Sequence, residues 1–472
     1  MVLASFSFFL TLFLLVGLSS ARVARRSRQD YYLASQSVSP WAAGLSAVAT
    51  NNSGYMFIGV IGYTHATGLA AAWLMVGWIA GDFVASQLVH RRLREATAAT
   101  GESTFLGVLS GWYGTNFLWF RRVAAVLTMV FLGAYAAAQV NAGGKALHAN
   151  LGWSEDAGAL AVGALVVAYC LAGGIRASIW TDVAQSLVML GAMALLLAVG
   201  VQQLGGAGYA WDRLSAIPGF MDWQPPSDQM VLTGFAGTAM FAFAWLFAGL
   251  SVAGQPHVMV RFMALDSGRN MPLARLVYYG FFILFYACAT GVGLLSRLYI
   301  PDLGAIDPEL ALPRMADLLL PPVLVGLILA GIFSATMSTA DSLVLSCSSA
   351  LTSDLPKRPI DSVLVSKGAT VFFTAAAVVL AIFDQQSVFD LVILAWSSLA
   401  SAFVPVVLVY SLRGKPSEAQ ALLMMTVGVL VALGWRAAGL HQGIYEGLPG
   451  ILSGLAVYLC SQVLLKAAGR RR

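Results

Sequence analysis

Hydroxyl and carboxyl side chains are concentrated within one long apolar segment, residues 320–349. Ala335, Ser338, Thr339 and Ser342 follow one another at offsets of 0, 3, 4 and 7, so they share one face of a helix. Several neutral oxygen atoms on such a face can bind a monovalent cation without holding it too tightly to release it. Helix packing by small polar residues would produce the same pattern. Asp341 favours the cation site, because a carboxylate inside a membrane span is costly and more often marks a function.

Two further apolar segments contain residues that interrupt a helix. Residues 50–54 (Thr-Asn-Asn-Ser-Gly) are poor helix formers whose side chains compete for backbone hydrogen bonds. Residues 254–257 (Gly-Gln-Pro-His) lose an amide donor at the proline. Unwound backbone inside a membrane supplies carbonyls and amides to a ligand, as in secondary carriers. Glycine and proline are also common in ordinary membrane helices, and this is the simpler explanation for either segment alone.

The elements that carry these residues are expected to be membrane helices. Hydrophobic residues make up 59% of the 472 and charged residues only 10%, too few to cover a water-soluble surface. The long unbroken apolar runs indicate helices, so the sequence predicts an all-α polytopic membrane protein. We expect about thirteen transmembrane helices, near residues 3–20, 40–63, 66–89, 119–142, 157–174, 179–203, 230–258, 273–298, 320–349, 364–383, 388–411, 418–435 and 446–465.

The order of the spans predicts an internal repeat. The two interrupted segments are the second and seventh spans, the spacing expected of a 5+5 inverted repeat in which each half begins with a broken helix. No polar block separates the spans, so we expect one membrane domain over residues 1–472. Its predicted parts are an extra N-terminal helix (3–20), two five-helix repeats (40–203 and 230–411) and two C-terminal helices (418–465). A cleaved signal peptide is the alternative for the first segment, although nothing basic precedes it.

The placement of charge predicts the orientation. Basic residues cluster on one side of the predicted spans, at 22–28, 91–122, 176, 261–275, 357–367, 413–415 and 466–472, whereas few lie on the other side. The positive-inside rule then places the N-terminus outside the cell (inner or plasma) membrane and the C-terminus in the cytoplasm. The net charge of +5 is too small to indicate nucleic acid as a partner. Because HExxH, GxSxG and phosphate-loop motifs are absent from the sequence, we expect no enzyme.

Five separated blocks of sequence carry a resemblance to a known family. They are Asp30-Tyr31-Tyr32-Leu33-Ala34 followed by Trp41 to Ala47, Trp180-Thr181-Asp182 with Gln185, Gly254 to His257 through Arg261 to Ser267, Ser338-Thr339, and Cys347 to Leu355. Over about residues 30–412 the chain resembles the sodium:solute symporter family, nearest to its sodium/proline permeases. The resemblance implies the leucine-transporter-type fold and sodium-coupled import of a small polar organic solute by alternating access.

The resemblance also implies where Na⁺ binds. Carried over by position, the ligands are the backbone carbonyls of Ala49, Asn52 and Ala335 and the hydroxyls of Ser338 and Thr339. Some members of the family have a second cation site. Its counterparts here are Asp182, Ser338, Asp341 and Ser342.

Two departures from the proline permeases bear on the solute. Asn51 stands where they have Asp, and Ala248 and Val252 stand where they have Trp and Tyr, so we expect proline to be a poor substrate and a small amino acid or organic acid to be carried. The anionic end of the solute is expected at the broken second span, near amides and a positive helix end. The candidate substrate-binding residues are Asn51, Ser53, Gly54, Tyr55, Tyr135, Gln139, Phe247, Val252, Trp396 and Phe403. The expected partners are the solute, sodium and the lipid bilayer. A membrane sensor that retains the symporter fold and a proton-coupled carrier remain the alternatives.

Overall fold

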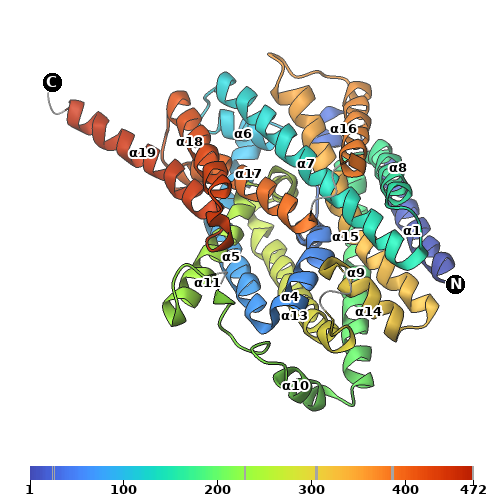
Figure 1. Cartoon of the computed structure of the whole chain (residues 1–472). Helices are drawn as coiled ribbons and strands as arrows, with labels where there is room; N and C mark the ends of the chain where they lie inside the picture. The colour runs from blue at the N-terminus through green and yellow to red at the C-terminus, as the bar shows by residue number, and fades with distance from the viewer. Residues whose placement is uncertain (24, 26, 228–229, 303–306, 384–386, 470–472) are drawn as a thin grey trace.

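The computed structural model describes residues 1–23, 25, 27–227, 230–302, 307–383 and 387–469. These residues form a bundle of helices, with a single isolated backbone bridge between Val38 and Leu265 (Figure 1). Arg26 and Arg470 to Arg472, used above to predict the orientation, lie outside the described residues. The α-helices are α1 (Val2–Ser19), α2 (Arg28–Leu33), α3 (Pro40–Gly54), α4 (Ile61–Thr67), α5 (Ala72–Thr100), α6 (Phe105–Gly111), α7 (Leu118–Leu151), α8 (Glu155–Gly173), α9 (Ile175–Gln203), α10 (Ala207–Ser215), α11 (Gly234–Leu250), α12 (Pro256–Met263), α13 (Met271–Tyr299), α14 (Ala311–Leu319), α15 (Pro322–Ser349), α16 (Val363–Phe383), α17 (Val388–Ser411), α18 (Glu418–Ala437) and α19 (Gly447–Gly469).

The number of crossings agrees with the prediction. Twelve helical segments of the described chain are long and apolar enough to cross a membrane, and the longest, Pro40–Thr100, has 61 residues. One straight helix of that length would measure about 90 Å, three times the hydrocarbon core of a bilayer. The segment is broken at Ser53 (φ 41°, ψ 176°) and turns at Gly68 (φ 79°, ψ −150°). α3 and α4 therefore make one crossing and α5 the next, which gives the thirteen crossings expected of the all-α fold.

The turn at Gly68 also corrects one predicted boundary. A Cβ atom at this position would lie 2.0 Å from the carbonyl oxygen of Phe220, and the same carbonyl accepts a hydrogen bond from the Leu69 amide at 2.8 Å. The chain is thus held in a turn here, and α5 begins at Ala72 rather than at residue 66. Its polar last turns continue to Thr100, beyond the predicted end at residue 89, because the helix is not limited to the apolar run.

The contacts between helices are reciprocal, as a 5+5 inverted repeat requires. α11 packs along α5 and α3 along α13, so the first helix of each half packs on the second helix of the other. In the same way α9 packs on α15, and α17 packs on α7. α1, α8 and α16 group on one side of the bundle and α18 with α19 on the opposite side (Figure 1).

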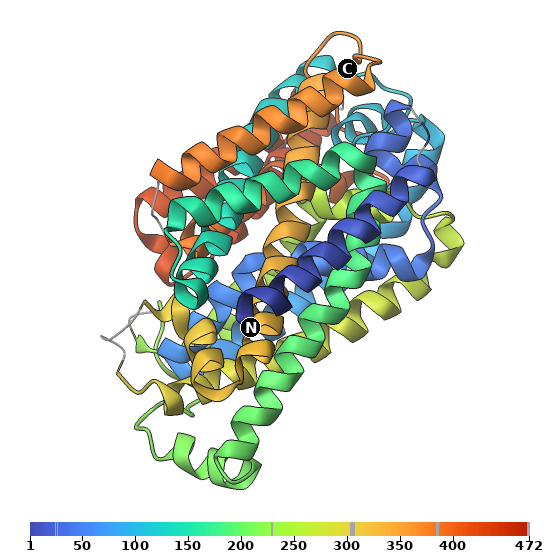
Figure 2. The same ribbon diagram turned by 90° about the vertical axis from the view of Figure 1, so that its right-hand side faces the viewer.

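Burial separates a central group of helices from the helices that face lipid. In the most apolar window of α15 and of α17, 83% and 89% of the residues are buried, against 17% in α1 and in α19. α10 and the loop at residues 355–362 lie at opposite ends of the bundle (Figure 2). The polar patch of α15 and the breaks in the two interrupted helices therefore lie in the interior.

Candidate functional site

The break in α3 is held open by contacts from a neighbouring helix. Ser53 adopts a positive φ of 41°, and the chain continues as a wide turn, η3 (Tyr55–Val60), before α4. The Gly54 amide donates to Oε1 of Gln139 in α7 at 2.7 Å. A Cβ atom at Gly54 would lie 2.7 Å from the Thr336 side chain, so only glycine allows this close approach of α3 to α15.

The oxygen atoms predicted to bind a cation meet where α3 crosses α15. The Ser338 hydroxyl donates to the carbonyl of Ala49 at 3.2 Å and to that of Ala335 at 3.1 Å. The Thr339 hydroxyl donates to the carbonyl of Thr50 at 2.8 Å, a group that the sequence analysis did not include. Hydroxyl and carbonyl oxygens shared between two helices are ligands that hold a monovalent cation weakly.

Asn52, the remaining predicted ligand, lies in the same turn. Its carbonyl accepts a hydrogen bond from the Tyr55 amide, and its fully buried side-chain amide has no hydrogen-bond partner among the described residues. A buried amide without a partner is costly, which is typical of a position that meets a ligand.

A guanidinium group stands among the four residues predicted as a second cation site. Nη2 of Arg261, on α12, donates to Asp182 Oδ2 at 3.4 Å and also to the Ser342 hydroxyl. Asp341 Oδ1 accepts from Ser342 at 2.7 Å and from Ser178 at 3.0 Å, and Ser178 in turn accepts from Arg261 at 2.8 Å. All five residues are buried. We call them the inner charge cluster.

Arg261 is the main residue of this cluster that the sequence analysis did not include. It was assigned to the cytoplasmic surface, but every residue of α12 is buried. Arg121 and Arg176, assigned in the same way, are also buried, where they form ion pairs with Asp354 at 2.8 Å and Asp30 at 2.6 Å. The apolar residues that surround Arg261 in the sequence were the available sign that its helix stays inside the protein.

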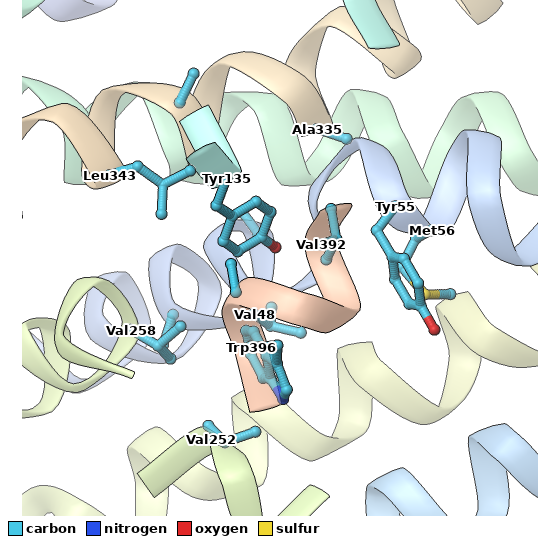
Figure 3. Packing of buried hydrophobic residues seen from close by; sticks show 14 of the residues in the cluster. Val48, Tyr55, Met56, Tyr135, Val252, Val258, Ala335, Leu343, Val392 and Trp396 are labelled. Atoms are coloured by element: carbon cyan, nitrogen blue, oxygen red, sulfur yellow. The ribbon is translucent and has the colours of Figure 1, made fainter. Parts of the chain in front are cut away.

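Aromatic rings surround the break in α3. Tyr135 of α7 and Trp396 of α17 lie with ring centroids 6.4 Å apart, and Trp78 of α5 lies 5.1 Å from Trp396 and 5.8 Å from Tyr55. In Figure 3 the Trp396 ring is drawn between Tyr135 and Val252. Trp78 was not predicted, because its position follows from the crossing of α5 with α11 and not from a local motif.

Two predicted substrate residues lie apart from these rings. The ring contact of Phe403 is with Phe105 of α6, 5.9 Å away, two turns of α17 beyond Trp396. The ring contact of Phe247 is with Phe243, 5.4 Å away, whose side chain is 54% exposed on the outside of the bundle. Asn51 also has a structural partner, since its Nδ2 donates to the Tyr278 hydroxyl.

Two neighbouring cavities lie beside this centre at one end of the bundle. Cavities of about 390 and 450 Å³ share Tyr63 and Phe389 in their walls, and the Phe389 ring packs 5.2 Å from Tyr55. The first cavity is also lined by Lys145 and Glu309, which form an ion pair at 2.5 Å. At the other end the cavity lined by Arg261 measures only about 30 Å³, and a separate cavity of about 490 Å³ lies between Trp112, Tyr410 and Lys415.

These features define a class of membrane protein. Two helices broken in mid-membrane, an oxygen-lined helix crossing one of them and an aromatic centre between are the arrangement of a secondary carrier. Residues 31–428 match the model of the sodium:solute symporter family, and the chain belongs to this family. It is a multi-pass membrane protein, and sodium is the coupling ion for the small-molecule solute that it carries.

Individual relatives agree with this assignment. The chain is 32% identical over 449 residues to the high-affinity proline transporter PutP of Bacillus subtilis, covering 93% of each chain. It is 29% identical to the sodium/proline symporter of Escherichia coli, covering 99% of this chain and 93% of the relative. A solved structure of a Na⁺-coupled sialic acid symporter in a substrate-bound outward-open state aligns with a TM-score of 0.80 at 20% identity, over 97% and 96% of the two chains. The last likeness concerns the fold alone.

Proposed function

We propose that sodium binds where α3 crosses α15, at the carbonyls of Ala49, Asn52 and Ala335 and the hydroxyls of Ser338 and Thr339. The observation that carries the proposal is the Ser338 hydroxyl, which bonds a carbonyl of each helix. A cation at this point would join the broken helix to α15, so its arrival and departure would change how the two helices are held together.

The test is sodium-dependent uptake into proteoliposomes by the Ser338→Ala, Thr339→Ala double variant. Losing two of five oxygens leaves a desolvated cation short of ligands, so the apparent sodium affinity should fall at least about tenfold. Ser334→Ala is the matched control, because among the described residues the Ser334 hydroxyl bonds within α15 alone, to the Ala330 carbonyl. Unchanged sodium dependence in the double variant would overturn the site.

For the solute we propose a small zwitterionic amino acid or a related organic acid. Gln139 supports the binding of a solute carboxylate at the break in α3. Its Oε1 accepts from the Gly54 amide, whereas its buried Nε2 has no partner among the described residues and can donate to the solute. Two of the relatives named above are a proline transporter and a sodium/proline symporter, but Ala248 and Val252 replace two aromatic residues of the proline permeases. We therefore propose a weaker preference for a flat ring.

A competition panel of unlabelled amino acids and organic acids against the labelled solute separates these possibilities. Gln139→Leu should weaken every carboxylate-bearing competitor about equally. Tight, stereospecific proline uptake would show that Trp78 and Trp396 supply the ring contacts, and a neutral sugar as sole substrate would remove the argument from Gln139.

For the inner charge cluster we propose that Arg261 supplies the positive charge that Asp182 and Asp341 require. In the arrangement seen here its guanidinium stands where a second sodium ion was predicted. A second ion would bind to Asp182, Ser338, Asp341 and Ser342 only after Arg261 has moved away, so we propose that one sodium ion is carried per solute.

We also propose the predicted orientation, with the N-terminus outside and the C-terminus in the cytoplasm, and the repeat boundaries 40–203 and 230–411. The two cavities that share Tyr63 and Phe389 then open to the outside. The test is to introduce single cysteines at Asp307 and at Lys357 and to label them on intact cells with an impermeant maleimide. Reaction at Lys357 alone would show that the orientation is the opposite one. Uptake by the purified chain in liposomes distinguishes a carrier from a sensor or an enzyme.

A further inference from the structure

One acidic side chain of the interior takes no part in the sites described above. Asp82, in α5, is fully buried. Its Oδ2 accepts a hydrogen bond from the Tyr278 hydroxyl at 2.6 Å, whereas its Oδ1 has no hydrogen-bond partner within the described part of the chain. None of the ion pairs among the described residues includes it. An unpaired carboxylate is so costly inside a membrane protein that the group must hold a proton or a cation.

The packing around Asp82 excludes water. A Cβ atom at Gly81 would lie 1.8 Å from the Leu246 carbonyl oxygen, and one at Gly249 would lie 1.9 Å from the Trp78 carbonyl oxygen. α5 and α11 are therefore in direct backbone contact beside the carboxylate, and no solvent fits between them at this level.

The groups that face Asp82 are phenols. α11 and η6 (Ser251–Gly254) contain no titratable residue, and α13 presents Tyr278, Tyr279 and Tyr286. The charged and titratable groups of the other elements packed on α5 are engaged elsewhere or exposed: Arg261 at Asp182, His257 against Tyr135 and Trp396, Arg275 on the Ser86 carbonyl, His90 against Phe262, Tyr410 against Trp112, Asp390 with Arg436, Arg94 on the Leu265 carbonyl, Arg91 with Glu95, and Arg92 and Arg269 at the surface.

A chain of hydrogen bonds leads from Asp82 to the broken helix. The Tyr278 hydroxyl, which donates to Asp82, accepts from Nδ2 of Asn51 at 2.5 Å. Asn51 lies two residues before Ser53, where α3 breaks, and two residues after Ala49. A change of charge at Asp82 therefore acts on the backbone that offers its carbonyls to sodium.

We propose that Asp82 is a proton-binding site of this carrier, separate from the sodium ligands, and that Tyr278 couples it to the break in α3. The oxygen atoms at hand are those of one carboxylate and of Tyr278 and Tyr279, fewer than the five oxygens at the crossing of α3 with α15, so a proton fits and a sodium ion does not. One proton taken up from water converts the carboxylate to the carboxylic acid at Oδ1, and the same proton returns to water in a conformation that exposes Asp82. The proton site itself does not depend on the proposed function. Only the second test below, which measures uptake, rests on it.

The first test is infrared difference spectroscopy of the full chain in lipid nanodiscs, titrated with acid. The wild type should show the carbonyl stretch of a buried carboxylic acid, and Asp82→Asn should lose that band, while Asp156→Asn, which removes an exposed acid at the start of α8, should keep it. Loss of the band on adding sodium at constant pH would make the occupant a sodium ion and overturn the proposal. An unchanged band in Asp82→Asn would overturn it too.

The second test is the pH profile of uptake at saturating sodium. In the wild type the rate should change by up to about tenfold per pH unit through the titration of one proton, and in Asp82→Asn the profile should be flat. Tyr278→Phe keeps the ring but removes the hydroxyl, so it should keep the infrared band and lose the pH dependence of uptake. A wild type that shows the band but no sodium-driven uptake would count against the proposed function and not against the proton site. A wild-type profile retained in Asp82→Asn would overturn the coupling.

Discussion

Replacing Arg261 by Met is the sharpest test of the inner charge cluster. The guanidinium donates to Ser178 and Ser342 and faces Asp182, all of them buried. Met keeps much of the side-chain length but leaves the carboxylates of Asp182 and Asp341 without a positive partner. Breaking a buried ion pair in this way costs about 3–5 kcal/mol, a large share of the 5–15 kcal/mol that stabilises an ordinary domain. We therefore expect Arg261→Met to unfold at a clearly lower temperature in sodium-free buffer.

Sodium should recover much of this loss. Once the guanidinium is gone, the two carboxylates become a cation site, and a ligand at a hundred times its Kd stabilises the folded state by about 2.7 kcal/mol. The assay is thermal unfolding of the purified protein in detergent, with sodium chloride exchanged for choline chloride at constant ionic strength. Wild type should gain less, because only the proposed site at the crossing of α3 with α15 is then open to sodium.

The matched control is the Arg261→Met, Asp182→Asn double variant. It removes one of the two unpaired charges, so it should be more stable than Arg261→Met alone and should lose the additional sodium effect. Equal unfolding temperatures for wild type and Arg261→Met without sodium would show that Arg261 does not balance these carboxylates, and the proposal for the cluster would fall.

Two further predictions concern stability. Burial raises the pKa of the Asp30 carboxyl, but the hydrogen bonds from Arg176 and two other donors outweigh it and hold that pKa below its ordinary value. The stabilising effect is therefore complete above the ordinary pKa of about 4 and is lost as the pH falls through the lower folded value, so Asp30→Asn should be less stable at neutral pH and should respond less to acid in unfolding measurements. Gly81→Ala should destabilise the protein by about 1–3 kcal/mol and abolish uptake, because its Cβ meets the Leu246 carbonyl, although alanine favours a helix. Gly191→Ala in α9, where a Cβ meets nothing within 4 Å, is the control and should be neutral or stabilising.

The parts of the fold that were predictable depend on local signals. Long apolar runs gave the crossings, and clusters of poor helix formers gave both breaks, at Ser53 and at Gln255 (φ −98°, ψ 102°). Offsets of 3 and 4 placed Ser338 and Thr339 on one face, and both meet the carbonyls of α3 there. These signals act within one helix, and the sequence contains them in full.

The residues that were missed or misplaced depend on which helices cross. Trp78 and Asp82 reach the centre because glycines let α5 and α11 touch, and nothing in either segment alone indicates this pairing. Phe403 shares a helix face with Trp396, but α17 is long enough that the two rings lie at different depths, the first against α6 and the second at the break in α3. Spacing along one helix gives the face of a residue and not its partner on another helix.

The charges of the interior can now be balanced. The inner charge cluster contains the carboxylates of Asp182 and Asp341 but only one guanidinium, so one negative charge remains. Ser342 donates to the carbonyl of Ser338, which places that remaining charge next to the predicted sodium ligands. A sodium ion at the proposed site where α3 crosses α15 would therefore neutralise the cluster, and a proton on Asp82 would neutralise the second unpaired acid. Because charge separation inside a membrane is costly, a carrier with both ions bound and its interior neutral has the lowest barrier to reorientation. Without sodium the uncompensated charge lies in the inner charge cluster, and without the proton it lies at Asp82, at the other end of the hydrogen-bonded path through α3. The two ions should therefore favour the same conformation, although they bind at separate sites.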